Sequence, residues 1–438
     1  MQPTRSFQLT HKAVMSIALP VMISNVSTPL IGIVDTGVVG QIPDPAYIGA
    51  VAVGALIFTF VFWAFGFLRM GTTGLTAQAY GAADALEVSA GLGRALLLAG
   101  LAGTLLIVLQ WPIRETAFVL LEGSAAVEAL ARSYFDIRIW AAPATLANYA
   151  LLGWFIGLGR TDIGLVLQLT LNLTNMALDA VFVLGFGWDV RGVALGTVIA
   201  EYSAVAVGLL IAWHSVRSTP LKAELLLRSS RLKRTLAVNG DIMVRSLALI
   251  AVFVWFMAQG ARQGDVILAA NAVLMHFISF AAFFLDGLAF AAETLVGRAL
   301  GATHRAGLRA AVKLTTYWAV LTAVLLSLGM VLAGTALIDL LVVDSAARAA
   351  ARSYLPWAVL APLLGVWAFQ LDGIFIGATQ TVEMRNAMLL SLAIFVLAWW
   401  CLRPWANHGL WAALYVHYCA RVGTLYYYYP RLLRSVPA

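Results

Sequence analysis

The feature of this sequence that most limits its fold is a series of long apolar runs that contain no Asp, Glu, Lys or Arg. A helix needs about 20 largely apolar residues to cross the hydrocarbon core of a membrane, which is about 30 Å thick. Strands of a membrane barrel are much shorter, about 10 residues, and alternate in polarity. We therefore predict an all-α membrane protein with twelve transmembrane helices. The runs are 13–34, 45–68, 95–113, 139–159, 163–178, 202–216, 246–261, 266–285, 314–338, 353–371, 386–402 and 404–420, and several spans must extend past a neighbouring acid to reach full length.

The composition agrees with a membrane protein. Of the 438 residues, 62% are hydrophobic and 11% charged, whereas soluble domains have about 45–50% and about 25%. These values exclude a disordered chain, a coiled coil and a secreted disulfide scaffold. The net charge of +7 is expected in loops beside the membrane, so no nucleic-acid partner is predicted and lipids are expected around the helices.

The cations predict the orientation of the chain. With the N-terminus inside, 17 of the 28 lysines and arginines fall in inner loops and tails and 7 in outer loops; the rest lie within or near the spans. Cytoplasmic loops carry an excess of Lys and Arg. We therefore expect a multi-pass protein of the inner (plasma) membrane with both termini in the cytoplasm.

The sequence repeats itself with an offset of 220 residues. Gly153–Gly157 and Gly373–Gly377 agree at four of five positions, and the Arg-Ser-Tyr sequence at 132–134 recurs at 352–354. Each repeat carries six spans, an even number, so both repeats enter the membrane from the same side. The prediction is two six-helix lobes related by a parallel repeat, an architecture suited to alternating access.

The longest and most basic connection marks the boundary between the lobes. It places an N-lobe with helices 1–6 at 1–213, a cytoplasmic inter-lobe loop at 214–237 and a C-lobe with helices 7–12 at 238–438. No extramembrane domain remains, so a transporter is favoured over a scaffold or a sensor.

Acids at membrane depth are the main candidates for function, because a charge at the bilayer centre costs about 2.5–3.5 kcal/mol on insertion scales. In the first half, Asp35 follows Thr28 on one helix face, and Asn172, Asn175 and Asp179 share a face at spacings of three and seven residues. Such oxygens can hold a shared proton or a sodium ion, or they can join helices by hydrogen bonds.

The sixth span adds two residues to this group. Thr197 and Glu201 are four apart, and Glu201 is expected either to take part in the polar cluster or to pair with a cation such as Arg69. Pro20 lies in the middle of the first span. It is either a packing kink or a hinge that moves during transport.

The second half has its own acids. Asp286 and Glu293 lie seven residues apart on the eighth span, and Asp372 lies on the tenth. Ion binding and structural pairing with Arg245 or Arg298 are both open for these residues.

Several segments resemble the multidrug and toxic compound extrusion (MATE) family of transporters, over about 12–430. Two of them are similar to the DNA-damage-inducible (DinF) branch of that family, namely Arg69–Leu75 and Leu371–Gly377. The segments that resemble the family at large are Ala18–Asn25, Val34–Gly40, Thr76–Gly81 and Asn172–Asp179.

The resemblance implies export of cationic or amphipathic small molecules in exchange for protons or sodium. Carried over by motif, the ion-coupling cluster is Asp35, Asn175, Asp179 and Thr197, with Pro20 as the bend in helix 1. The remaining polar candidates are Thr28, Asn172, Glu201, Asp286, Glu293 and Asp372. The sodium-type branch uses an acid on helix 7 that this sequence lacks, which favours the proton.

Two alternatives remain open at this point: a sodium-coupled drug antiporter, and a flippase of lipid or polysaccharide precursors with the same architecture. No nucleotide-binding loop, zinc motif or nucleophile elbow occurs, so no enzyme, cofactor or metal is predicted. We expect a monomer.

Overall fold

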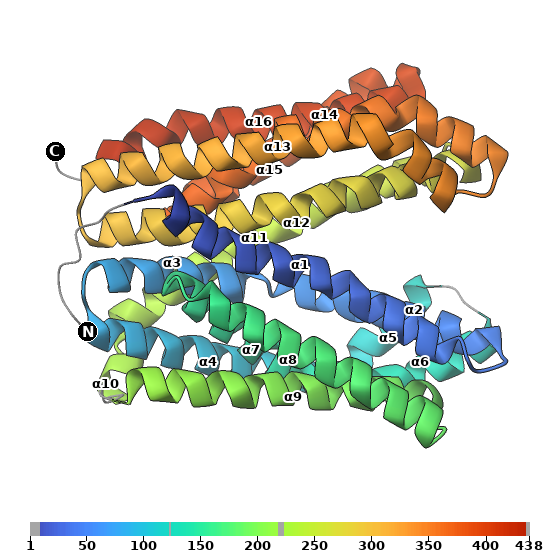
Figure 1. Ribbon diagram of the computed structural model, residues 1–438, viewed down its shortest axis with the longest axis horizontal. Helices are drawn as coiled ribbons and strands as arrows, with labels where there is room; N and C mark the ends of the chain where they lie inside the picture. The colour runs from blue at the N-terminus through green and yellow to red at the C-terminus, as the bar shows by residue number, and fades with distance from the viewer. Residues whose placement is uncertain (1–8, 122–123, 218–222, 435–438) are drawn as a thin grey trace. The chain divides into compact units, whose positions relative to one another are not determined.

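The computed structural model describes residues 9–121, 124–217 and 223–434, and within these ranges the chain is helical without β-strands (Figure 1). Short 3-10 turns follow α6 and α15, and a π-helical turn, Ala180–Gly185, follows α8. The α-helices are α1 (His11–Val39), α2 (Pro45–Ala64), α3 (Phe67–Gly81), α4 (Ala85–Val108), α5 (Gln110–Leu120), α6 (Ala125–Arg138), α7 (Ala142–Gly157), α8 (Thr161–Asp179), α9 (Asp189–Val216), α10 (Ala223–Leu226), α11 (Ser229–Ala261), α12 (Asp265–Gly301), α13 (Arg305–Leu341), α14 (Ser345–Ala378), α15 (Thr381–Leu402) and α16 (Ala406–Arg434).

By length and composition, 11 helical segments in the described residues can cross a membrane. The last of them, Thr381–Arg434, has 54 residues, and as one straight helix it would measure about 81 Å, far more than a bilayer. Instead it breaks at a 3-10 turn, Arg403–Trp405, and at Ala406, whose φ is +48°. The two parts, α15 and α16, pack against each other. The architecture of about twelve apolar helices therefore confirms the predicted fold class.

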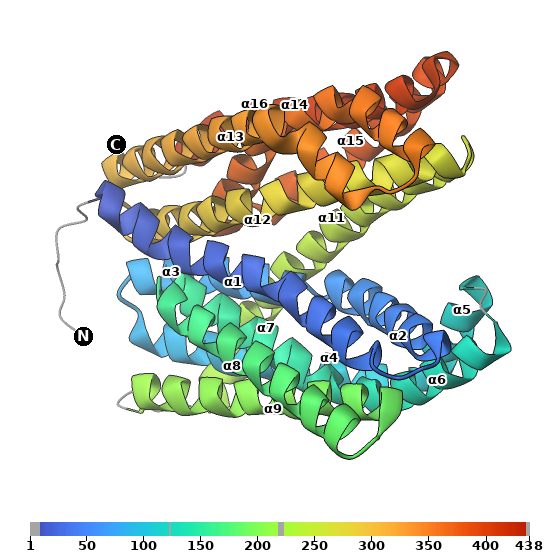
Figure 2. The same ribbon diagram turned by 45° about the vertical axis from the view of Figure 1, so that its right-hand side comes forward.

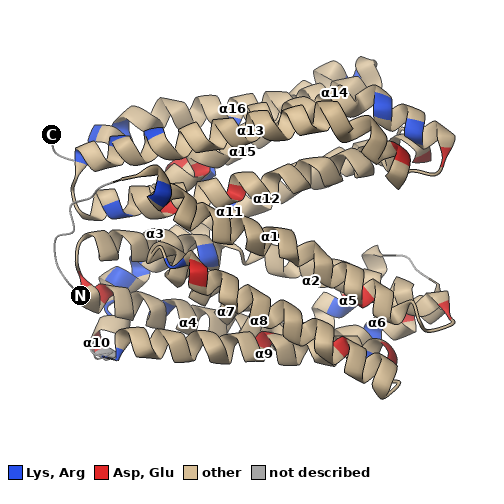
Figure 3. Ribbon diagram, viewed as in Figure 1, with Lys and Arg blue, Asp and Glu red and all other residues tan. Residues whose placement is uncertain are grey.

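Capping residues start several helices where the sequence has a short acid. The Asp84 carboxylate accepts the backbone N–H of Glu87 at 2.9 Å at the start of α4. At the start of α14, Asp344 accepts that of Ala347 at 2.7 Å. Such caps satisfy N–H groups that have no partner within the helix. Figure 3 shows charged residues mostly near helix ends, with few in the middles of the helices.

The chain forms two compact units. One contains residues 23–76 and 84–236, and its main helix pairs are α8 with α9, α4 with α7, and α2 with α6. Figures 1 and 2 both show α8 and α9 side by side. The core of this unit includes the stacked rings of Phe58 and Phe135, whose centres are 5.0 Å apart.

The other unit contains residues 1–22, 77–83 and 237–438. Its main helix pairs are α12 with α14 and α15 with α16. Fully buried aromatic side chains fill its core, with the rings of Phe256 and Trp411 edge to face at 5.0 Å. Edge-to-face packing is a favoured arrangement for aromatic pairs.

The 220-residue repeat has a geometric counterpart inside each unit. Gly153 of α7 lies directly against the carbonyl group of Arg69, and Gly373 of α14 lies in the same way against that of Ala289. A Cβ atom at either glycine would collide with the backbone opposite. Both partners of the second crossing follow those of the first by 220 residues, so the repeat preserves a helix crossing that only glycine permits.

Helix α1 is divided between the two units. Its residues up to Met22 belong to one unit and those from Ile23 to the other. Pro20 lies three residues before this division, within a helix that continues from His11 to Val39. A proline inside a helix removes one backbone hydrogen bond, so the helix is weakened beside the point where it passes from one unit to the other.

The predicted loop at 214–237 contains helical segments in the described residues. Its first residues end α9 at Val216, α10 covers Ala223–Leu226, and α11 begins at Ser229. The first turns of α11, up to Leu236, belong to the same unit as α9. The part of the loop at 218–222 lies outside the described residues.

Candidate ion-coupling site

The central feature of the unit that contains α8 and α9 is a pair of acids. The carboxyl groups of Asp35, on α1, and Asp179, at the end of α8, face each other within hydrogen-bonding reach. Asp179 is fully buried. Neither of its carboxylate oxygens, nor Oδ1 of Asp35, receives a hydrogen bond from a donor among the described residues. Two carboxyl groups in this arrangement can bond to each other only when they hold a proton between them.

Local backbone geometry positions Asp179. It is the last residue of α8, and the chain then widens into the π-helical turn Ala180–Gly185. Such turns are rare and occur frequently at functional sites. On the facing helix, Gly196 of α9 lies against Oδ1 of Asp179, and a Cβ atom there would overlap with that oxygen. Glycine at position 196 thus makes room for the carboxyl group.

The amide of Asn175 connects α8 with α9 one turn before Asp179. Its Nδ2 donates to Oγ1 of Thr197 at 3.1 Å, and the Thr197 hydroxyl donates to the carbonyl oxygen of Val193 at 2.8 Å. The buried Oδ1 of Asn175 has no donor among the described residues. The four residues that we predicted for ion coupling therefore lie in one region of one unit, on α1, α8 and α9.

Asn172 and Thr28 have other surroundings. Nδ2 of Asn172 donates to the Ser27 hydroxyl at 2.9 Å, and its Oδ1 accepts from Gln168 at 2.8 Å. Asn172 therefore joins α8 to α1, as the hydrogen-bonding interpretation expects. The exposed Thr28 donates to the carbonyl oxygen of Ser24 in its own helix at 3.3 Å.

Glu201 forms a second buried cluster on the same face of α9. Its Oε1 accepts from the Arg138 guanidinium at 3.3 Å, and its Oε2 accepts from Nδ2 of Asn148 at 2.8 Å. The sequence predicted either a cluster residue or a partner for a cation such as Arg69. The ion pair in the structure is with Arg138, a residue that sequence reasoning did not select.

The acids of the other unit lie in different surroundings. Asp372 of α14 forms ion pairs with Arg245 of α11 and Arg421 of α16, and all three side chains are buried. This is the structural pairing that the sequence left open. The two guanidinium groups both contact Oδ2 of Asp372. Glu293 is buried on α12, and Asp286 is partly buried.

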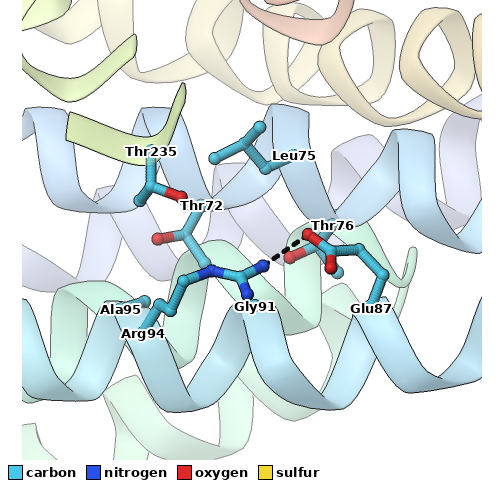
Figure 4. A pocket seen from close by; sticks show the side chains of 8 residues that line it. All are labelled: Thr72, Leu75, Thr76, Glu87, Gly91, Arg94, Ala95 and Thr235. Carbon is cyan, nitrogen blue, oxygen red and sulfur yellow. Dashed lines mark hydrogen bonds and ion pairs between the residues drawn. The ribbon is translucent and has the colours of Figure 1, made fainter. Parts of the chain in front are cut away.

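A small cavity lies between α3 and α4 (Figure 4). It holds about 10 Å³, which is room for about one water molecule. The buried Arg94 forms an ion pair with Glu87 beside it and donates to the carbonyl oxygen of Leu225 in α10 at 2.9 Å. This site attaches α10 to α4 and is too small for a drug.

Comparison with known proteins gives the family. The MatE family model matches residues 20–181 and 242–400, one match in each repeat. "DNA damage-inducible protein F" of Escherichia coli (strain K12) is 42% identical over 415 residues, covering 94% of this chain and 90% of the relative. "Probable multidrug resistance protein NorM" of Rhizobium meliloti (strain 1021) is 25% identical over 324 residues, with 72% and 69% covered.

A solved structure has the same fold. A transporter of the MOP superfamily from Pyrococcus furiosus superimposes with a TM-score of 0.87 over 100% of both chains at 17% identity. The family match covers both halves of the sequence and the first relative covers nearly the whole chain. This chain therefore belongs to the MatE family of membrane transporters.

Proposed function

We propose that this protein exports cationic or amphipathic small molecules across the inner membrane in exchange for protons. Membership of a transporter family supports the general role, and the name of the Rhizobium relative refers to multidrug resistance. The observation that carries the choice of ion is the facing pair Asp35 and Asp179, without a donor or cation against the Asp179 oxygens in the described residues. A proton is the ion that such a pair binds most simply.

The proposed cycle uses the position of Asp35 on α1. When both acids are protonated, they no longer share one proton, and Asp35 forms different hydrogen bonds. Since α1 also contains Pro20, a change at Asp35 is expected to bend the helix near residue 20 and to reduce the space available for substrate in the N-lobe. Protons that enter from outside would thereby expel the drug by alternating access.

The proposal includes the topology predicted from the cations. Both termini lie in the cytoplasm, the lobes comprise 1–213 and 238–438, and residues 214–237 connect them on the inner side. The protein acts as a monomer surrounded by lipids. Its substrates are small molecules, as is usual for a site between helices.

Sodium is the second candidate ion. The buried Oδ1 of Asn175 has no donor among the described residues, like the two oxygens of Asp179. Together with Thr197 they are hard oxygen ligands, which alkali and alkaline-earth cations prefer. A bound sodium ion would require these oxygens to converge on one point, whereas a proton requires only the two facing carboxyl groups.

The test is transport in proteoliposomes with an imposed pH gradient or an imposed sodium gradient. We expect wild-type export of a cationic dye such as ethidium to follow the pH gradient and to be indifferent to sodium. Asp35→Asn cannot release a proton and should abolish export while leaving the amount of folded protein unchanged. Export driven by sodium alone, or full export by Asp35→Asn, would contradict the proposal.

A further inference from the structure

A buried arginine in the same unit as the acidic pair has no assigned role. Arg138 ends α6, and only 8% of it is exposed. Its guanidinium carbon lies 5.5 Å from the ring centre of Phe58 and 5.4 Å from that of Phe62. A cation is almost never buried in this way without a paired charge, so its partners indicate what it does.

Glu201 neutralises Arg138 only in part. One terminal nitrogen, Nη2, donates to Oε1 of Glu201, while Nη1 is buried without an acceptor among the described residues. The second oxygen of Glu201 is occupied by Asn148. A guanidinium has five N–H donors, so this arrangement leaves positive charge available to other acids nearby.

Helical spacing on α9 and on α6 relates Glu201 and Arg138 to residues beside the acidic pair. On α9, Glu201 follows Thr197 by one turn on the same face, and Thr197 holds Asn175 beside Asp179. On α6, Arg138 follows Tyr134 by one turn, and Tyr134 lies within electrostatic range of Asp35 and Asp179. Arg138 itself interacts electrostatically with Asp35.

We propose that Arg138 is the counter-cation of the Asp35–Asp179 pair, and that Glu201 determines how much of its positive charge the pair experiences. Arg138 is then a positioning residue: it need not touch the proton, but it favours the ionised form of the pair from nearby. This inference deepens the proposed function and rests on it. Other charged or titratable groups around the site also contribute to the electrostatic environment of the pair. They are Tyr134 on α6, Tyr149 on α7 and Arg69 on α3.

The sign of the effect separates this role from simple packing. Glu201→Gln removes the negative charge that partly neutralises Arg138, so the pair should lose its protons more easily. Removing the arginine charge as well, in Arg138→Gln with Glu201→Gln, should reverse that change. Each shift is expected to be about one pH unit, the usual size for one charge added or removed near a partly buried site. Arg138→Lys in the wild-type background keeps the charge and should stay near wild type.

The experiment measures protonation directly. Dicyclohexylcarbodiimide modifies protonated carboxyl groups in apolar surroundings, and mass spectrometry of purified full-length protein quantifies labelling of Asp35 and Asp179 from pH 5 to pH 9. We expect the midpoint of labelling to move to lower pH in Glu201→Gln and back to higher pH in the double variant. The double variant is the matched control, because it has the same glutamine at position 201 and leaves no unpaired buried charge.

Failure of this inference and failure of the proposed function give different results. Identical midpoints in the wild type, Glu201→Gln and the double variant would overturn the role of Arg138, even if export follows a pH gradient. A lower labelling midpoint in Glu201→Gln that returns to higher pH in the double variant would support the role of Arg138 as counter-cation. If export by the same protein ignored the pH gradient, proton coupling would be overturned.

Discussion

Replacing Gly196 by alanine is the most local perturbation of the acidic pair that the structure offers. The new methyl group would overlap Oδ1 of Asp179, while its other neighbours, the Asp179 nitrogen and Cβ of Leu178, lie at an ordinary 3.4 Å. The methyl group therefore conflicts with the carboxyl group and not with the helix backbone. We expect the Asp179 side chain to rotate away from α9 and to lose its position facing Asp35.

The size of the effect follows from the cost of overpacking. Forcing one methyl group into a filled site costs about 1–3 kcal/mol. A change in activation free energy of about 1.4 kcal/mol alters a rate tenfold. If the displaced carboxyl group must return to its position in each transport cycle, the full cost enters the rate. Export by Gly196→Ala should then fall about 5-fold to 150-fold.

The assay is dye export in proteoliposomes under a fixed pH gradient, with folded protein quantified by size-exclusion chromatography. The control is Gly208→Ala on the same helix, where the added Cβ meets a methyl group of Leu151 at 2.8 Å and no carboxyl group. Gly208→Ala should lower thermal stability to a similar degree and leave export near the wild-type rate. Equal export by both variants would refute the reasoning, because overpacking alone would then explain the result.

Four further predictions use other parts of the chain. Pro20→Ala should reduce export with folded protein near normal, measured as dye export per folded molecule; an unchanged rate would favour a packing kink. Asp372→Asn should lower the melting temperature without changing the pH dependence of export, because Asp372 pairs two buried arginines. Asn271→Ala and Asn407→Ala break the same reciprocal amide pair, so in thermal unfolding the double variant should lose less stability than the sum of the single variants. Leu227→Cys, at a position 64% exposed, should react with a membrane-impermeant maleimide in inside-out vesicles and not in intact cells, in a background without Cys401 and Cys419.

The sequence predicted the fold because its strongest signals are local. A run without charges, such as 266–285, indicates a span wherever its neighbours lie, and the structure contains it within α12. The repeat could be recognised from short motifs because Gly153 and Gly373 occupy positions where a side chain would collide with a backbone carbonyl. The ends of helices were harder to predict, because α12 continues through Asp286 and Glu293 to Gly301.

Members of the candidate site that share one helix were predictable from their spacing. Asn172, Asn175 and Asp179 share a face of α8, and their spacing identified them. The Glu201–Arg138 pair joins residues that are 63 positions apart on α9 and α6. No periodicity within either helix connects such partners, so sequence reasoning offered Arg69 as an example of a cation for Glu201. Depth in the membrane identifies an acid, but the choice of its partner depends on how the helices pack.

The repeat also shows how the two halves differ at the positions of the candidate ion-coupling residues. Helix α8 begins at Thr161 and α15 at Thr381, again 220 residues later. At the positions of α15 that correspond to Asn175 and Asp179 stand Phe395 and Trp399, both buried in the apolar core of their unit. An aromatic ring there can neither bind a proton nor face an acid across the helix pair. The repeat thus keeps corresponding spans in both halves, while the facing acids Asp35 and Asp179 lie on α1 and α8 of the first half. The cycle proposed above acts through α1, so it needs proton-binding groups that contact that helix. A proton can then shift the conformation only if it binds the two states with different affinity.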